Sequence, residues 1–319
     1  MRRRTNTLSA WEVVVMYKRI LLPLDGSALA ESALPLARRL TVSADGVLYL
    51  VQAVEINTHA VPAGYEFGVS YIEESYRKQR ERASEYIAGR QGALRAEGVR
   101  TASEVRVGNP AEIIIETAER EAIDLIVMTT HGYRGLTRWM LGSVAERVLR
   151  HAPCPVLIVR EDRPIQHILV PLDGSKLAEA ALPHALALAD LVNASVTLLR
   201  VDDTLSLMDY ASIDALDQFE PGLADAVRGQ HAYESEGYLS GIVGRLETIV
   251  PVRFESPMGD AVNCILETAE RQACDLIVMS THGRSGVRRW VYGSVTEKVL
   301  RSATQPLLVV RPDGRDEAA

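Results

Sequence analysis

A carboxylate followed by glycine and serine ends a short apolar run at two places, as Pro23-Leu24-Asp25-Gly26-Ser27 and as Pro171-Leu172-Asp173-Gly174-Ser175. A carboxylate in this position can accept hydrogen bonds from the ribose or base of a nucleotide. The same residues can instead form an Asx turn or a helix N-cap, and for this element alone we favour that structural interpretation. This element alone therefore does not indicate nucleotide binding.

Glycine-rich segments follow in each half of the chain. Because glycine has no Cβ, the backbone can come close to a ligand there and turn its N–H groups toward an anion. The residues concerned are His131, Gly132 and Gly135 in the first half, and His282, Gly283 and Gly286 in the second.

Each glycine-rich segment leads to a predicted helix start, Gly142-Ser143-Val144 or Gly293-Ser294-Val295. The N–H groups and the dipole at a helix start favour phosphate oxygens, and the serine hydroxyl adds a donor. Taken alone, such a start is more often a simple cap. The three elements together, at matching positions in both halves, favour a phosphate site in at least one half.

Short β-branched and aliphatic runs alternate with longer amphipathic segments throughout the chain. Continuous apolar runs such as Leu125 to Met128 indicate strands that are covered on both faces, as in parallel sheets. We predict two Rossmann-like, doubly wound α/β domains, each with a five-stranded parallel sheet and about four helices. The predicted strands lie near 18–24, 47–54, 101–107, 124–129 and 154–160, and near 167–172, 195–202, 250–256, 274–280 and 305–311.

The two halves are an internal repeat. The Asp-Gly-Ser element recurs after 148 residues (173 − 25) and the Gly-Ser-Val element after 151 (293 − 142), which indicates a duplicated domain. We expect a disordered extension at 1–16, domains at 17–160 and 166–311, a charged linker at 161–165 and a tail at 312–319. The linker contains Pro164, which suits neither a sheet interior nor a helix.

The composition excludes several classes of protein. With 319 residues, of which 47% are hydrophobic and 24% charged, each half can bury its own core. The net charge of −7 argues against nucleic acid as a partner. The apolar runs are too short for a membrane span, and three cysteines without metal-ligand spacing fit a reducing compartment. We expect a cytoplasmic protein without a metal site.

From Tyr17 to Arg311 the chain resembles the universal stress protein family. Nucleotide-binding members of that family carry Gly-x2-Gly-x9-Gly-Ser/Thr after the fourth strand. The spacing from Gly132 to Gly142, and from Gly283 to Gly293, matches this pattern. Thr129 and Ser280 stand where the pattern has its first glycine, and their Cβ atoms narrow the approach of a ligand.

This resemblance implies a binding site for ATP, with or without Mg²⁺ or Mn²⁺ held through its phosphates. Asp25 and Asp173, which follow Pro23 and Pro171, would contact the adenosine part, and Ala53 and Val201 would offer backbone groups to adenine. Met128 with Thr129, and Met279 with Ser280, would line the base and ribose. The later glycines and serines would hold the phosphates: Gly132, Gly135, Gly142, Ser143, Gly283, Gly286, Gly293 and Ser294. Their neighbours His131, Val144, His282 and Val295 are counted with the binding site.

Other conspicuous residues have a structural alternative. No Ser, Cys or carboxylate is spaced to form a triad with His131 or His282, so we expect loop roles and no catalytic residue. Trp139 and Trp290 are expected to be packing or interface residues. The long segments 56–72 and 203–225 are either lids or mobile insertions.

The sequence thus predicts an ATP-binding stress-response protein that acts as a sensor or regulator through its conformation or assembly. One alternative is a slow ATPase or a nucleotidyl-transfer enzyme on the same fold. Another is a nucleotide-free interaction module. No Gly-x4-Gly-Lys-Ser/Thr motif is present, so weak ATPase activity is the most that we expect.

The last strand of each half lies at the end of its predicted sheet. An uncovered apolar edge invites aggregation, so we expect the two domains to pair through these strands as a pseudo-dimer. A homodimer of the whole chain is a further option.

Overall fold

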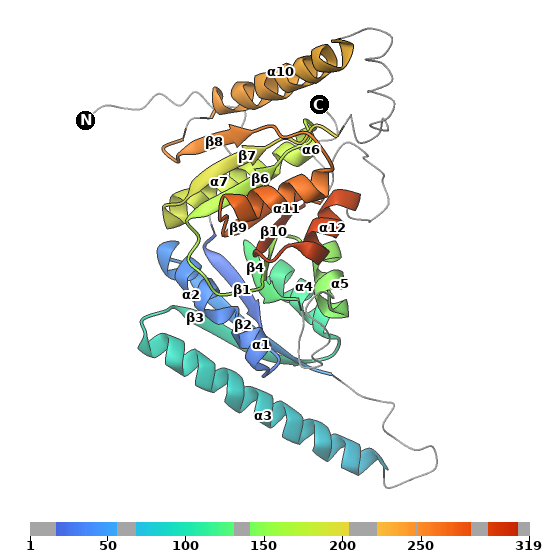
Figure 1. The fold of residues 1–319 in the computed structure, drawn as a ribbon. Helices are drawn as coiled ribbons and strands as arrows, with labels where there is room; N and C mark the ends of the chain where they lie inside the picture. The colour runs from blue at the N-terminus through green and yellow to red at the C-terminus, as the bar shows by residue number, and fades with distance from the viewer. Residues whose placement is uncertain are drawn as a thin grey trace, which may run out of the picture. The chain divides into compact units, whose positions relative to one another are not determined.

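The computed structural model describes residues 17–55, 68–130, 141–203, 222–246, 248–281 and 293–311, with the backbone alone at 68–73 and 223–228. The chain divides into two compact units, Met16–Arg163 and a second one that begins at Pro164. Each unit is an α/β fold around a parallel sheet, as the sequence predicts (Figure 1).

In the first unit, parallel strands are arranged in the order β3-β2-β1-β4-β5. Its elements, in chain order, are β1 (Arg19–Pro23), α1 (Ala28–Glu31), α2 (Leu34–Ser43), β2 (Val47–Val54), α3 (Gly68–Ala96), β3 (Thr101–Val107), α4 (Pro110–Arg120), β4 (Leu125–Thr129), α5 (Ser143–His151) and β5 (Val156–Val159).

The second unit repeats this order as β8-β7-β6-β9-β10. Its elements are β6 (His167–Pro171), α6 (Lys176–Glu179), α7 (Ala181–Val192), β7 (Ser195–Leu199), α10 (Leu223–Val243), β8 (Val252–Glu255), α11 (Ala261–Arg271), β9 (Leu276–Ser280), α12 (Ser294–Ser302) and β10 (Leu307–Val310).

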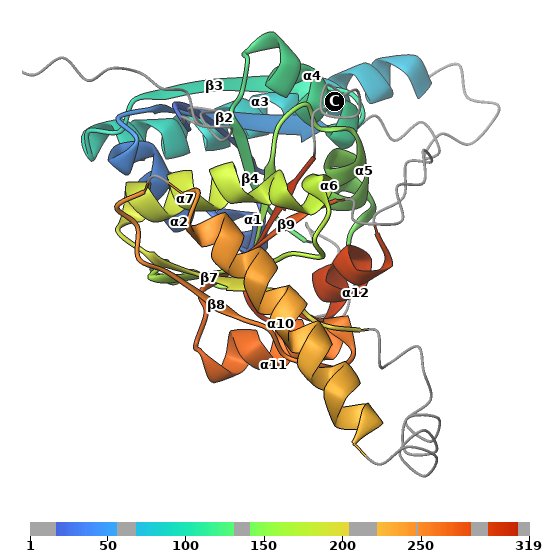
Figure 2. The ribbon, with the colours of Figure 1, turned by 90° about the horizontal axis from the view of Figure 1, so that it is seen from above.

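The strand order reverses direction between β1 and β4, and again between β6 and β9. Right-handed crossovers therefore place α2 and α3 on one face of the first sheet and α4 and α5 on the other. α3 packs on β2 and β3, while α4 packs against α5; α10 lies next to β8, and α11 against α12 (Figures 1 and 2). The reversal points are where ligands bind in sheets of this kind.

The first predicted helix of each unit is interrupted. α1 ends at Glu31, and α2 starts again at Leu34 with Pro35 in its first turn, where the missing N–H does no harm. In the second unit Ala180 both ends α6 and precedes α7. The turn that follows each Asp-Gly-Ser element is therefore a short, separate helix.

The predicted strands agree with the observed ones except at their ends. The largest difference is β7, which ends at Leu199, so Val201 lies beyond the strand that we expected to contain it. The expected loops at 56–72 and 203–225 are partly wrong, because α3 begins at Gly68 and α10 at Leu223. Residues 56–67 and 204–221 of these segments, and the terminal segments 1–16 and 312–319, lie outside the described residues.

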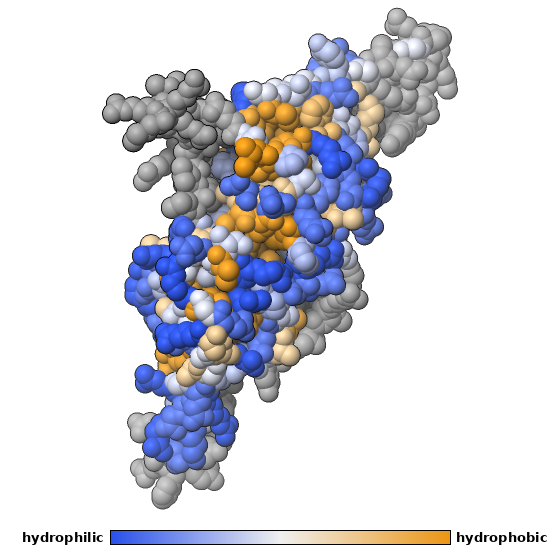
Figure 3. All heavy atoms as spheres, turned by 90° about the vertical axis from the view of Figure 1, so that its left-hand side faces the viewer, coloured by the Kyte–Doolittle hydropathy of each residue, from blue (hydrophilic) through white to orange (hydrophobic). Residues whose placement is uncertain are grey.

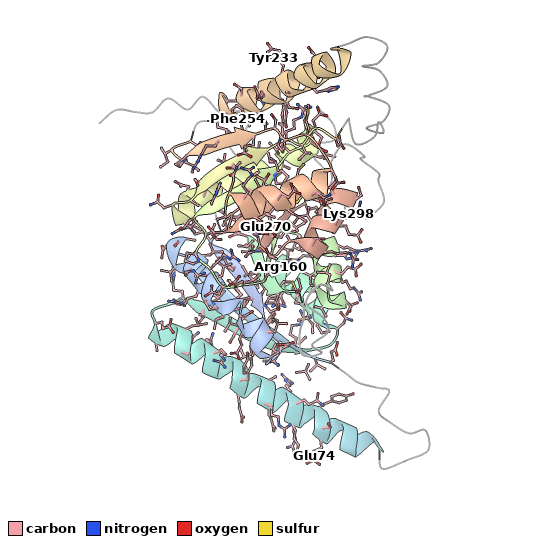
Figure 4. The ribbon with its side chains drawn as sticks, viewed as in Figure 1. Glu74, Arg160, Tyr233, Phe254, Glu270 and Lys298 are labelled. Carbon is pink, nitrogen blue, oxygen red and sulfur yellow. The ribbon has the colours of Figure 1, made fainter. Side chains whose placement is uncertain are left out.

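Most side chains on the face drawn in Figure 3 are hydrophilic, with apolar patches between them. Tyr233 on α10 and Phe254 on β8 are among the exposed apolar side chains (Figure 4). Glu74 lies near the N-terminal end of α3 (Figure 4). No helix in the described part of the chain combines the length and the apolar character that crossing a membrane requires.

Candidate functional site

The Asp-Gly-Ser element of the first unit forms the turn between β1 and α1. Gly26 has φ +82°, a conformation that favours glycine. The Ser27 N–H donates to Asp25 Oδ1 over 2.9 Å, and Ser27 Oγ accepts from the Ala30 N–H over 3.1 Å. The predicted Asx turn and N-cap are thus both present, and they hold the half-buried Asp25 at the carboxyl end of β1.

The second unit has the same turn between β6 and α6. Gly174 has φ +85°, and Asp173 Oδ1 accepts from the Ser175 N–H over 2.9 Å and from the Ser175 hydroxyl over 2.6 Å. Ser175 Oγ in turn accepts from the Ala178 N–H over 3.1 Å. An ionised carboxylate has about four lone-pair sites, so these bonds are compatible with a ligand donor as well.

The backbone of Ala53 is the second component of the site. On β2 the hydrogen bonds alternate: Val47 N–H and Val51 C=O pair with the β1 side, and Leu48 N–H and Val54 C=O with the β3 side. By this alternation the N–H and C=O of Ala53 point to the β1 side. β1 has ended there, since its last partner on β2 is Val51.

Val201 has the corresponding position in the second unit. Ser195 N–H and Leu199 C=O pair with the β6 side, whereas Arg200 N–H and Asp202 N–H donate to carbonyls on the β8 side. The N–H and C=O of Val201 therefore point past the end of β6. Among the described residues, no hydrogen bond joins the backbone of Ala53 or Val201 to the segment that follows β1 or β6.

Strand β4 ends with Met128 and Thr129, and β9 with Met279 and Ser280; all four side chains are buried. The next residue in each unit, Thr130 or Thr281, accepts a backbone hydrogen bond from the glycine that precedes the following helix. That bond measures 2.8 Å both from the Gly142 N–H and from the Gly293 N–H. It brings each helix start to the carboxyl end of the strand beside β1 or β6.

Gly142 and Gly293 are the N-cap residues of helices α5 and α12. Glycine has no side chain, so neither N-cap residue makes a side-chain cap hydrogen bond. By contrast, Asn109 caps α4 and Asp260 caps α11. Ser143 and Ser294 are exposed, and Val144 and Val295 are half-buried. Both predicted helix starts are confirmed, and their N-cap residues supply no side-chain acceptor for the first N–H groups of the helix.

The fold itself does not require glycine at position 293. Its φ of −54° suits any residue, and among the described residues the atom nearest to an added Cβ would be the Thr281 carbonyl oxygen at 3.6 Å. Serine, asparagine or aspartate would be a better N-cap than glycine. The helix cap therefore does not explain the glycine at this position.

Six predicted site residues lie outside the described part of the chain: His131, Gly132, Gly135, His282, Gly283 and Gly286. The described ones gather at the carboxyl edge of each sheet, around the reversal points. In the described ranges no three His, Cys, Asp or Glu side chains are grouped as a metal site would require.

Two tyrosine–glutamate pairs, which were not predicted from the sequence, join α3 to α1 and α10 to α6. Tyr86 on α3 donates to Glu31 Oε1 over 2.7 Å, and Tyr238 on α10 donates to Glu179 Oε1 over 2.8 Å. The internal repeat contained the signal, because both members of the pair recur at matching positions. The second unit also has His231 Nδ1 at 3.6 Å from Asp202 Oδ2.

Comparisons with known proteins agree with this architecture. The model of the universal stress protein family matches residues 16–160 and 164–311. A universal stress protein of Mycolicibacterium smegmatis is 26% identical over 300 residues, which cover 92% of this chain and 97% of that protein. One of Methanocaldococcus jannaschii is 35% identical over 149 residues, or 46% of this chain and 85% of that protein. The crystal structure of a universal stress protein from Archaeoglobus fulgidus shares the fold, with a TM-score of 0.64 at 21% identity over 95% of this chain and 99% of that one.

Proposed function

The chain belongs to the universal stress protein family, and from this premise we propose that each of its two domains binds ATP at the carboxyl edge of its sheet. The adenosine part would lie beside Asp25 or Asp173, and the phosphates at the start of α5 or α12. In this proposal Met128 with Thr129, and Met279 with Ser280, line the base and ribose.

The backbone of Ala53 and Val201 is the observation that carries the proposal. In each domain one N–H and one C=O point past the end of the neighbouring strand, next to the aspartate turn. Adenine presents an acceptor ring nitrogen beside an exocyclic N–H donor, so one backbone N–H and one C=O can satisfy both. Guanine presents a donor and an acceptor in the opposite order on that edge.

The helix starts supply the phosphate end of the proposed site. Uncapped N–H groups and the helix dipole stabilise an anion by about 0.3–1 kcal/mol, and by up to about 2 kcal/mol when partly buried. Gly142 and Gly293 place no side chain over these groups. Mg²⁺ or Mn²⁺ would then be held through the phosphates rather than by a protein cage.

The proposed output is regulatory. A nucleotide that binds one conformation or assembly better than another shifts the population toward it, and a partner can read that shift. The last strands of the two domains, β5 and β10, are proposed to pair as in a pseudo-dimer. The free cysteines fit the cytoplasm as the proposed setting.

Calorimetry with ATP and Mg²⁺ on the full chain tests the proposal. We expect micromolar binding, because about 0.3 kcal/mol per heavy atom gives roughly 9 kcal/mol for a ligand of this size. Hydrolysis should be slow or absent, and alanine at His131 and His282 should leave any residual rate unchanged. Rapid turnover that depends on either histidine would favour the enzyme alternative instead.

A further inference from the structure

Helix α1 connects the proposed adenosine site to helix α3. It has four residues, too few to be stable alone, since a helix needs about 12–15 residues in water. Its N-terminal end is fixed by the Asp25 and Ser27 turn. At its C-terminal end, Glu31 Oε1 accepts the Tyr86 hydroxyl over 2.7 Å and lies 2.8 Å from Arg90 Nη2.

The same arrangement recurs in the second domain with a different cation. Tyr238 on α10 donates to Glu179, the last residue of the four-residue α6, and Glu179 is buried. The guanidinium of Arg200 lies 4.8 Å from the centre of the Tyr238 ring. Arg200 directly precedes Val201, the proposed adenine-binding residue. One tyrosine thus contacts both segments that would hold the adenosine.

Both phenols stay protonated over the whole physiological range. Burial, the hydrogen bond to Glu179 and the charges of Glu179 and Asp173 raise the pKa of the Tyr238 phenol well above its usual value. Burial and Glu31 raise the pKa of Tyr86 in the same direction. Each tyrosine is therefore a permanent donor to its glutamate, and the pair acts as a fixed link rather than a switch.

We infer that Tyr86 and Tyr238 are positioning residues for the nucleotide sites, and that their hydrogen bonds to Glu31 and Glu179 fix the short helices behind Asp25 and Asp173. This inference rests on the proposed function. Arg90 lies 2.8 Å from Glu31 and so holds it directly, whereas Arg200 lies over the ring of Tyr238 and donates to the Glu234 carbonyl. The second site therefore depends more strongly on its tyrosine than the first.

The test uses the full chain and three probes, namely ATP, adenosine and inorganic tripolyphosphate, each titrated by calorimetry. In Tyr86→Phe/Tyr238→Phe, the affinities for ATP and adenosine should fall by the same factor, about tenfold. Tripolyphosphate binding should not change, because α5 and α12 are untouched. If the hydroxyls only stabilised the fold, their removal would weaken the binding of all three probes alike.

Matched variants complete the experiment. Glu179→Gln keeps an oxygen that accepts from Tyr238 and should bind adenosine like the wild type, whereas Glu179→Leu should weaken binding as Tyr238→Phe does. Tyr233→Phe, an exposed tyrosine on the same helix, should change nothing. Thermal unfolding confirms that each variant is folded.

Two results would overturn the inference: unchanged adenosine affinity in the double tyrosine variant, or an equal loss for tripolyphosphate. A wild-type chain that binds neither ATP nor adenosine would instead refute the proposed function itself. The two failures are therefore distinguishable.

Discussion

The backbone N–H of Gly293 donates to the carbonyl oxygen of Thr281 over 2.8 Å. Gly142 and Thr130 make the same bond in the first domain. In each case the start of a helix without a side-chain cap is tied to the end of the strand next to the reversal point. The proposed phosphate site is thus held by the backbone on both sides of the glycine-rich segment.

Replacing Gly293 by aspartate should separate folding from binding. An aspartate N-cap satisfies the helix N–H groups and complements the dipole, so we expect the domain to gain about 0.5–1 kcal/mol of unfolding free energy. The same carboxylate would occupy the place proposed for the phosphates and repel them by its negative charge. ATP binding at the second site should therefore be lost. Thermal unfolding and calorimetry measure the two effects.

Gly293→Ala is the control, because its Cβ would meet the Thr281 carbonyl oxygen only at an ordinary 3.6 Å and adds no charge. It should reduce ATP affinity far less than Gly293→Asp. An aspartate variant that binds ATP as tightly as the wild type would show that the phosphates lie elsewhere.

The sites should prefer ATP to GTP. The N–H and C=O of Ala53 and Val201 complement adenine. Guanine would instead set a donor against each backbone N–H and an acceptor against each C=O, so neither group would be paired. We expect at least about tenfold weaker binding of GTP, which corresponds to about 1.4 kcal/mol. Competition between the two nucleotides measures this ratio, and equal affinities would mean that the backbone of these residues does not contact the base.

The isolated segment Met16–Arg163 should dimerise through β5. Ile126 N–H donates to the Pro155 carbonyl, so along β5 the backbone of Leu157 pairs with β4 while that of Ile158 turns away from β4. Ile158→Pro should therefore abolish dimerisation and leave the domain's own sheet intact. Light scattering reports the mass, and a stable wild-type monomer of this segment would contradict the pairing of last strands.

Most of the fold could be predicted from the sequence, whereas parts of the site could not. Buried strands such as β4 stand out because every residue from Leu125 to Thr129 is buried. The hydrogen bond from Tyr86 to Glu31 joins residues 55 positions apart. Local sequence patterns cannot predict a contact between residues so far apart. Our prediction assigned the first turns of α3 and α10 to the long segments that precede them, whereas these helices begin at Gly68 and Leu223.

The cysteines should differ in reactivity. Burial raises the pKa of the Cys154 and Cys274 thiols to about 12, so at pH 8 both stay protonated and poorly nucleophilic. Cys264 is less buried and should be alkylated first, followed by the other two only on unfolding. Mass spectrometry after timed alkylation gives the order, and early labelling of Cys274 would contradict it.

The same shifts set the alkaline limit of stability. The folded state keeps these two protons up to about pH 12, whereas unfolded thiols lose them from about pH 8.5. Since the folded state then binds more protons, stability is full below about pH 8.5 and falls as the pH rises toward 12. Replacing both cysteines by alanine should flatten this part of the stability curve.

The central claim is that each domain holds one ATP between its aspartate turn and its helix start. Calorimetric titration of the full chain with ATP and Mg²⁺, before and after Gly293→Asp, tests this most directly. We predict two micromolar sites per chain in the wild type and one in the variant, with the remaining affinity unchanged. Two sites of unaltered affinity in the variant, or no binding in either protein, would contradict the account.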